Sequence, residues 1–344
     1  MAIDPTSTKI LVTGANGFIG LHTVLHFLKR GYNLCATVRS QDQGEKVRQT
    51  LAKHTDTHKL EFIHADLTRE EGWDQAVAGC DFVLHLASPF PTDAPKDENE
   101  LIIPAREGTL RVLRAAQQGG VKRVVLVSSV VAVISGHERE NRTFNESDWT
   151  DTSKTDYAYA KSKTLAEQAA WEFIKSAENK NGMELVSVNP SNVFGPVLDN
   201  RQHTSTEWFG TLLRREIPGL TRTQLNLVDV RDLVEMIEKA MITPDAAGKR
   251  FIANGASIPL QEFALILDRN FASRGYRVPT RVLPDWLVRF FTIFNPKTKP
   301  VVDALGWDYS LSTEQARSVL GWQPRPYEGT VIEMAQSMME QGMV

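Results

Sequence analysis

The fold is decided by residues 9–20, which read KILVTGANGFIG. A short apolar run of strand-forming residues leads into Gly14, Gly17 and Gly20, and an amphipathic segment follows. The order strand, glycine turn, helix is a variant of the dinucleotide-binding motif. The first glycine permits a tight turn, the second lets a pyrophosphate approach the backbone, and the third lets the helix lie close to the strand. Because the free N–H groups at the helix N-terminus then face the phosphates, this stretch predicts a nucleotide site rather than an isolated turn.

The composition of the whole chain limits the classes of function. With 344 residues the chain can form a sizeable core and more than one structural unit. Its 39 basic and 42 acidic residues give a formal net charge of −3 without a long block of one sign, which argues against a nucleic-acid partner. No apolar run reaches the roughly 18 residues that cross a bilayer, and residues 1–8 lack the pattern of a signal peptide. We therefore expect a soluble cytoplasmic protein, monomeric or homodimeric, that acts on a small molecule and not at a membrane.

The cysteines and histidines indicate neither a disulfide framework nor a metal site. Cys35 falls in an expected strand and Cys80 at an expected turn, which fits a reducing compartment. The histidines show neither an HExxH motif nor close pairing, so we expect no metal.

After the glycine turn, apolar strands alternate with helical stretches, the pattern of parallel βαβ units. Strands are expected at residues 33–38, 60–65, 81–86, 121–127 and 183–188, and helices at residues 98–118 and 155–179. Ligands gather at the carboxyl ends of the strands in such a sheet. The predicted fold is an α/β Rossmann fold, a doubly wound parallel sheet with a smaller, interleaved C-terminal α/β lobe that binds the substrate.

The regular alternation breaks after residue 196, which suggests where the two parts divide. Residues 1–196 are predicted to form the cofactor-binding part, and residues 227–255 to return to it as a helix and a strand. The predicted substrate-binding lobe then comprises residues 197–226 and 256–344.

One helical stretch in that lobe, residues 283–294, carries an apolar stripe. Its members are Leu283, Trp286, Leu287, Phe290 and Phe291. We expect this stripe to pack between the lobes rather than to contact a membrane or cover a substrate.

The end of the second expected strand indicates which dinucleotide is bound. Arg39 stands there, and arginine suits a ribose 2′-phosphate, whereas an acidic residue would suit a free 2′-hydroxyl. Lys46 follows seven residues later, and the alternative interpretation is a solvated arginine and a helix-surface lysine. Asp66, which ends the third strand, either binds the adenine amino group or caps the next helix. NADP(H) is therefore predicted in preference to NAD.

The expected helix at residues 155–179 contains two overlapping YxxxK patterns, Tyr157 to Lys161 and Tyr159 to Lys163. At about 100° per residue, each pair shares a face with a different set of side chains. The face of Tyr159 and Lys163 includes Ala166, Ala170, Phe173, Ile174 and Ala177, whereas the face of Tyr157 and Lys161 includes Thr164, Gln168, Glu172, Lys175 and Asn179. Since the first face is apolar, Tyr159 and Lys163 are predicted to point towards the core.

These motifs resemble those of the extended short-chain dehydrogenases/reductases. The resemblance rests on TGANGFIG at residues 13–20, on Arg39, Ser129 and YAKSK at residues 159–163, and on NPS at residues 189–191. The run SKTLAEQAAW at residues 162–171 is most similar to the dihydroflavonol reductase-like branch, which includes cinnamoyl-CoA reductases and microbial aldehyde and carbonyl reductases. The family's lysine before Thr-Leu-Ala-Glu corresponds to Lys163, which selects Tyr159 independently of the helical-face argument.

The resemblance implies a catalytic triad of Ser129, Tyr159 and Lys163. Tyr159 would protonate the developing alkoxide, Lys163 would lower the tyrosine pKa and bind the nicotinamide ribose, and Ser129 would hold the carbonyl oxygen. Together with the motifs above, it predicts these cofactor-binding residues: Gly14, Asn16, Gly17, Phe18, Ile19, Gly20, Arg39, Lys46, Asp66, Leu67, Ala87, Ser88, Pro89, Val127, Tyr159, Lys163, Pro190, Ser191 and Val193.

The predicted substrate side departs from the plant flavonoid reductases. Its residues are Phe90, Ile134, Phe194, Trp208 and Asn226. Plant enzymes of this branch hold the flavonoid hydroxyls with an asparagine and a glutamine, where this chain has Ile134 and Asn226. We therefore expect an NADPH-dependent reductase of an aldehyde or ketone. The alternatives are a nucleotide-sugar epimerase or dehydratase with bound NAD, which Arg39 disfavours, and a non-catalytic NADP-sensing regulator, which the retained triad disfavours.

Overall fold

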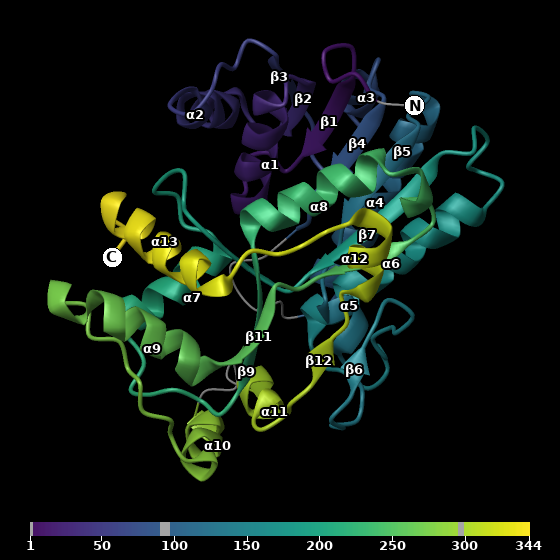
Figure 1. Ribbon diagram of the computed structural model, residues 1–344. Helices are drawn as coiled ribbons and strands as arrows, with labels where there is room; N and C mark the ends of the chain where they lie inside the picture. Colours follow the sequence, from purple (N-terminus) through teal and green to yellow (C-terminus); the bar gives the residue numbers. More distant parts are fainter. Residues whose placement is uncertain (1–2, 90–96, 295–298) are drawn as a thin grey trace.

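A seven-stranded parallel sheet forms the centre of the computed structural model, which describes residues 3–89, 97–294 and 299–344 (Figure 1). Its strands are β1 (Lys9–Thr13), β2 (Asn33–Val38), β3 (Leu60–His64), β4 (Phe82–His85), β5 (Arg123–Val127), β7 (Glu184–Pro190) and β10 (Arg250–Ala253). They lie in the order β10-β7-β5-β4-β1-β2-β3, so the chain moves outward from β1 in both directions. This order confirms the predicted doubly wound sheet, in which ligands bind where the winding direction reverses.

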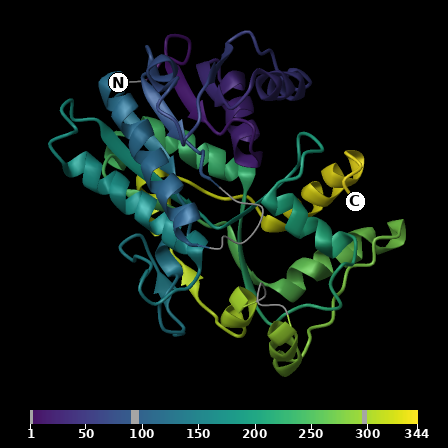
Figure 2. The ribbon, with the colours of Figure 1, turned by 180° about the vertical axis from the view of Figure 1, so that it is seen from behind.

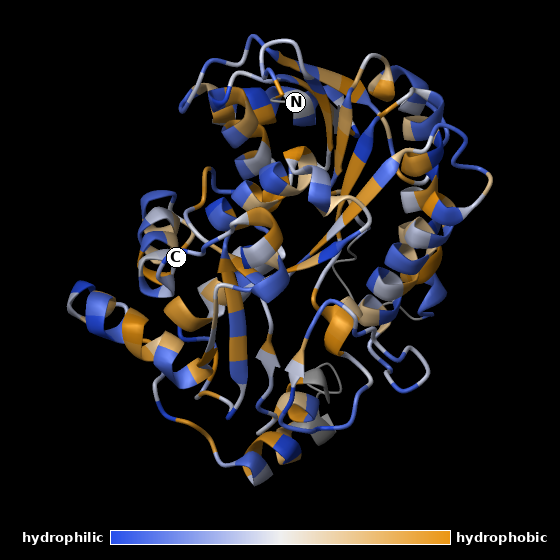
Figure 3. Ribbon diagram, turned by 45° about the vertical axis from the view of Figure 1, so that its right-hand side comes forward, coloured by the Kyte–Doolittle hydropathy of each residue, from blue (hydrophilic) through white to orange (hydrophobic). Residues whose placement is uncertain are grey.

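Helices cover both faces of the sheet, as Figures 1 and 2 show. One face packs on α3 (Trp73–Val77), α4 (Asn99–Gln118) and α6 (Ala158–Lys175), and the other on α1 (Phe18–Lys29), α2 (Gln41–Ala52) and α8 (Val230–Ile242). Successive strand residues point to opposite faces, so Ile10 and Val12 pack with α1 while Leu11 packs with α4. Both faces are therefore buried, and Figure 3 shows hydrophobic residues along the central strands.

A smaller sheet lies beyond the carboxyl edge of the large one. It joins β8 (Asn192–Phe194) in parallel, and β11 (Ala256–Pro259) in antiparallel, to β9 (Gln224–Asp229). The other elements are α5 (Val131–Ile134), β6 (Thr143–Phe144), α7 (Thr204–Leu213), η1 (Pro244–Ala246), α9 (Leu260–Phe271), η2 (Ala272–Arg274), α10 (Asp285–Phe294), α11 (Lys299–Ala304), β12 (Ser310–Leu311), α12 (Glu314–Leu320) and α13 (Tyr327–Glu340). Because the small sheet takes strands from both sides of residue 196, the parts interleave, and the boundaries given above stay a prediction.

Helix α6 is shorter than the expected 155–179, and two residues of the expected stretch differ from the predicted faces. Thr164, expected on the solvated face, is fully buried, and Ala177, expected inside, is exposed beyond the helix end. The Thr164 hydroxyl donates to the Ala160 carbonyl at 2.7 Å, so its burial leaves no unsatisfied group.

The expectation for the stripe on residues 283–294 is wrong for its aromatic members. Trp286, Phe290 and Phe291 are 69%, 49% and 50% exposed, whereas Val288 on the same helix is buried. The apolar pattern therefore marks a helix correctly, but the aromatic stripe is not its buried side. Among the described residues, no helix combines the length and apolar character needed to cross a membrane.

Candidate active site

The glycine turn after β1 has the shape of a phosphate cradle. Gly14 has a φ of +72°, and a Cβ there would lie 3.0 Å from the Ala87 backbone. A Cβ on Gly20 would lie 2.1 Å from the Gly14 carbonyl oxygen, so only glycine lets α1 start this close to β1. Gly17 caps α1 without a side-chain hydrogen bond, and a Cβ there would meet only the Gly14 oxygen, at 3.4 Å, among the described residues. The N–H groups of α1 are therefore open to an anion, which fits a pyrophosphate.

Next to this cradle, Thr13 and His85 form a buried pair that the sequence did not predict. Thr13 Oγ1 accepts from the amides of Leu86 at 3.1 Å and Ala87 at 3.0 Å, so its proton goes to His85 Nδ1, 2.8 Å away. The other proton of the neutral ring is then on Nε2, and burial lowers the pKa of His85 to about 3. Nε2 is buried and has no hydrogen-bond partner among the described residues. A buried donor left open at this sheet edge fits an acceptor group bound there.

Arg39 lies at the carboxyl end of β2, as expected. Its backbone amide donates to Gln43 and its carbonyl accepts from His64, whereas the side chain is exposed. Lys46 lies on the surface of α2 and pairs with Asp42, one turn earlier, at 2.8 Å. Arg39 is therefore the more available of the two cations for a phosphate.

Asp66 caps a turn. This agrees in part with the interpretation that it caps the next helix. Its Oδ1 accepts from the amide and hydroxyl of Thr68, at 2.8 and 2.7 Å, and these bonds hold the pKa of Asp66 below its usual value. The capped residues form a turn before α3 rather than a helix N-terminus.

The remaining predicted cofactor residues follow strand ends on the same edge of the sheet. Ala87, Ser88 and Pro89 come after β4, Val127 ends β5, Pro190 ends β7, Ser191 follows it, and Val193 lies in β8. Asn16, Phe18 and Ile19 belong to the glycine turn and the first turn of α1, and Leu67 follows Asp66. Because carboxyl ends of parallel strands meet at one edge, the residues that follow β4, β5 and β7 lie on the same edge of the large sheet as the glycine turn, whereas Val193 lies in the small sheet.

Helix α6 carries two of the three predicted catalytic residues, and the first of them meets Ser129. The Ser129 hydroxyl, just past β5, hydrogen-bonds the Tyr159 hydroxyl. Burial raises the pKa of Tyr159, and this bond opposes the rise. Lys163, one turn further along α6, is only 9% exposed, and burial lowers its pKa to about 8 against the field of Glu167. That Lys163 lowers the Tyr159 pKa stays a prediction. In the chain without cofactor, the hydrogen bond with Ser129 is what opposes the rise of the Tyr159 pKa.

The competing pair of the overlapping YxxxK patterns is placed differently. Tyr157 is 43% exposed, and Lys161 donates to the Glu98 carboxylate at 2.6 Å. Lys161 is therefore occupied by an ion pair with the residue that caps α4, and its side chain is only 18% exposed, less than the helical-face argument predicts for that side.

The predicted substrate residues fall into three places. Phe194 and Trp208 stack with ring centroids 5.5 Å apart, whereas Ile134 belongs to another apolar cluster with Phe144. Asn226 is 3% exposed, and its Oδ1 accepts from the side chains of Ser257 and Gln224. Phe90 lies outside the described residues.

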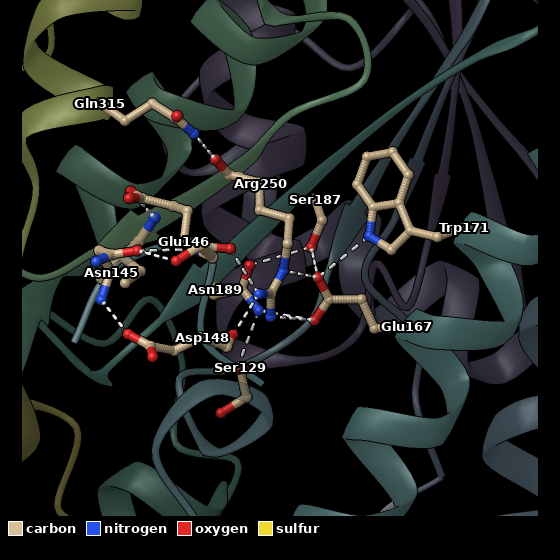
Figure 4. Close-up of polar contacts among 12 residues, drawn as sticks. Ser129, Asn145, Glu146, Asp148, Glu167, Trp171, Ser187, Asn189, Arg250 and Gln315 are labelled. Carbon is tan, nitrogen blue, oxygen red and sulfur yellow. Dashed lines mark hydrogen bonds and ion pairs between the residues drawn. The ribbon is translucent and has the colours of Figure 1, made fainter. Parts of the chain in front are cut away.

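A buried ionic network behind the triad, drawn in Figure 4, was also missed. Its centre is Glu167, which forms an ion pair with Arg250 at 2.7 Å. The available signal was the spacing, because Glu167 continues the i, i+4 series of Tyr159 and Lys163. Within the described part of the chain, no group of three or more metal-ligating side chains occurs.

The chain is similar to reductases over most of its length. It is 32% identical to a cinnamoyl-CoA reductase from Medicago truncatula, covering 99% of this chain and 98% of the relative. It is 31% identical to a dihydroflavonol 4-reductase from Hordeum vulgare, covering 81% and 79%. The solved structure of yeast methylglyoxal/isovaleraldehyde reductase Gre2 complexed with NADPH superposes with a TM-score of 0.81 at 27% identity, covering 98% of this chain and 100% of the yeast chain.

A family model covers most of the sheet and the triad. The model described as the NAD dependent epimerase/dehydratase family matches residues 10–254. This range includes the glycine turn, Ser129, Tyr159 and Lys163. The chain therefore belongs to the NAD-dependent epimerase/dehydratase family, that is, to the extended short-chain dehydrogenases/reductases.

Proposed function

We propose that this protein is an NADPH-dependent reductase of aldehydes or ketones. The observation that carries the proposal is the hydrogen bond between Ser129 and Tyr159 after β5, with Lys163 one turn further along α6 and almost fully buried. The reductase names of the curated relatives and the NADPH in the yeast structure support it.

The chain's own groups suit NADPH. The backbone of the glycine turn would hold the pyrophosphate, and the exposed Arg39 would pair with the 2′-phosphate. Lys163 would donate to the nicotinamide ribose, and the open Nε2 of His85 offers a further donor at the same edge. When bound, NADPH supplies the hydride.

In the proposed mechanism, the protein orients the carbonyl group and supplies the proton. The hydroxyls of Ser129 and Tyr159 donate to the carbonyl oxygen, and the phenolic proton moves to that oxygen as its negative charge develops. The buried ammonium of Lys163 then stabilises the tyrosinate that remains. Reduction therefore needs both Tyr159 and Lys163 protonated, and its rate should fall as the pH rises through the Lys163 pKa of about 8.

For the substrate, the polar groups favour a simple carbonyl compound over a flavonoid. Ile134 offers no hydrogen bond, and Asn226 Oδ1 is already occupied by Ser257 and Gln224. A buried flavonoid hydroxyl would lose one partner, which costs about 1–3 kcal/mol. Aromatic or aliphatic aldehydes are therefore expected to show a higher kcat/KM than dihydroflavonols, and the opposite order would reverse this assignment.

The decisive experiment compares two tyrosines on one helix. Tyr159→Phe keeps the ring but removes the proton donor, so kcat should fall by roughly a hundred- to ten-thousandfold while NADPH binding survives. Tyr157→Phe is the matched control, and its kcat should stay within a fewfold because a surface change rarely exceeds about 0.5 kcal/mol.

The assay follows NADPH oxidation with aldehydes and ketones, and the formation of sugar products with UDP-sugars, because an epimerase or dehydratase consumes no NADPH. Turnover of UDP-sugars alone would favour an epimerase or dehydratase, and NADPH binding without turnover of any compound would favour a regulator. Activity that followed Tyr157 rather than Tyr159 would contradict the mechanism.

A further inference from the structure

Glu167 lies one helical turn beyond Lys163 on α6, with its side chain fully buried. Its Oε1 accepts from Arg250 Nε and from the Ser187 hydroxyl, both at 2.7 Å. Its Oε2 accepts from Asn189 Nδ2 at 2.8 Å (Figure 4). Although burial alone would favour the neutral acid, Arg250 and the hydrogen bonds hold the pKa of Glu167 below its usual value, so the carboxylate stays charged.

Further contacts hold the Arg250 guanidinium in place, and the guanidinium in turn holds the Glu167 carboxylate. Its Nη1 donates to the backbone carbonyls of Glu146 at 2.8 Å and Asp148 at 2.6 Å, and its guanidinium lies 3.7 Å from the ring centre of Trp149. A buried ion pair of this kind often contributes no more stability than well-packed apolar side chains of similar size. A functional role would therefore explain why the Glu167–Arg250 ion pair is present behind the triad.

Two paths lead from Glu167 to the triad. Asn189 bonds the Glu167 carboxylate with the same amide nitrogen that donates to the Ser129 carbonyl, at 3.1 Å. The second path is electrostatic, because the carboxylate favours the protonated form of Lys163.

We propose that Glu167 is a positioning residue of this active site, which orients the Ser129 backbone through Asn189 and keeps the buried Lys163 ammonium protonated from one helical turn away. This inference rests on the proposed function, since it assigns a task to a residue behind the same triad.

The groups around Lys163 show why a carboxylate is needed. From β4, His85 faces it, but that ring is neutral because burial lowers its pKa to about 3. From α6, Tyr159 is neutral as well, because burial raises its pKa. Burial alone would lower the Lys163 pKa further than its value of about 8, and among these groups only Glu167 opposes it with charge. Without that charge, the Lys163 pKa would lie below about 8, and the ammonium would lose its proton at lower pH.

The test is Glu167→Gln, with Glu172→Gln on the exposed side of the same helix as the control. An opposite charge at this range is worth about one pKa unit or more. In Glu167→Gln, the high-pH limb of kcat should move to lower pH by about one unit, and the deficit against wild type should grow about five- to tenfold from low to high pH. A structural defect alone would lower kcat by the same factor at every pH, and that result would overturn the proposal. Glu172→Gln should leave the profile unchanged.

A second readout does not depend on turnover. In protein labelled with [13C]lysine, the resonance missing from Lys163→Ala identifies Lys163, and its titration gives the pKa directly. We expect a lower pKa in Glu167→Gln and an unchanged one in Glu172→Gln. An unchanged Lys163 pKa in folded Glu167→Gln would refute the inference. If wild type reduced no carbonyl compound, the proposed function would fail, while this titration would still decide the role of Glu167.

Glu167→Gln leaves Arg250 charged and buried, so a second variant guards against misfolding. Glu167→Met/Arg250→Met removes both charges together, a change that buried ion pairs often tolerate. If the double variant folds and its Lys163 pKa falls, the proposal holds. A folded double variant with the wild-type pKa and pH profile would overturn it.

Discussion

Removing the Arg39 side chain tests which dinucleotide the protein binds. A hydrogen bond to a charged group contributes about 1.5–3 kcal/mol. Arg39 is exposed at the end of β2, where water screens its charge, so the lower half of that range applies. Arg39→Ala should therefore weaken NADPH binding by about 1.5–2 kcal/mol, or roughly ten- to thirtyfold in Kd. NADH binding should barely change, because NADH lacks the 2′-phosphate.

The measurement is a fluorescence titration of both cofactors with both proteins, repeated at higher salt. Salt should reduce the preference for NADPH in wild type more than in Arg39→Ala, because exposed charges are screened. Lys46→Ala is the internal comparison, and its loss should stay within about threefold because Lys46 already pairs with Asp42 on the surface of α2. Equal affinity of wild type for the two cofactors, or an equal loss of both in Arg39→Ala, would refute the reasoning.

Two further predictions concern the folded state. Gly20→Ala places a Cβ 2.1 Å from the Gly14 carbonyl oxygen, so it should destabilise the protein by at least about 1–3 kcal/mol in urea unfolding and weaken NADPH binding. Gly329→Ala on α13 should do neither, because its Cβ would meet only the end of the Glu333 side chain, at 3.9 Å, among the described residues. Burial lowers the pKa of His22 to about 4, so the unfolded chain binds the proton first as the pH falls. His22 should therefore lower the free energy of unfolding by up to about 3 kcal/mol from about pH 6.5 to about pH 4, in addition to the contribution of His85, and a wild-type slope in His22→Asn would contradict this assignment.

The half of the site that we propose to bind the cofactor could be assigned from the sequence because its residues follow local patterns. A glycine turn after an apolar strand and Arg39 at the next strand end are each set by a few neighbouring residues. The two faces of α6 followed from its period, and Thr164 departed from it because a hydroxyl bonded to the preceding turn can be buried at little cost. The hydrogen-bonded network around Glu167 could not be predicted from neighbouring residues. Its partner Arg250 is 83 residues away, at the start of a short strand that reaches Glu167 only because β10 pairs with β7.

The substrate side depends on pairings of the same long-range kind. Phe194 comes from β8, Trp208 from α7 and Asn226 from β9, so no single segment fixes their mutual positions. The β9–β11 register places Ser257 opposite Asn226, and this pairing lets Ser257 donate to the asparagine oxygen. Asn226, which a sequence motif would assign to the substrate, therefore already has hydrogen-bond partners for its side-chain oxygen within the small sheet. Cofactor choice and substrate choice therefore have separate structural origins, so the Arg39 titration and the comparison of aldehydes with flavonoids test independent parts of the molecule.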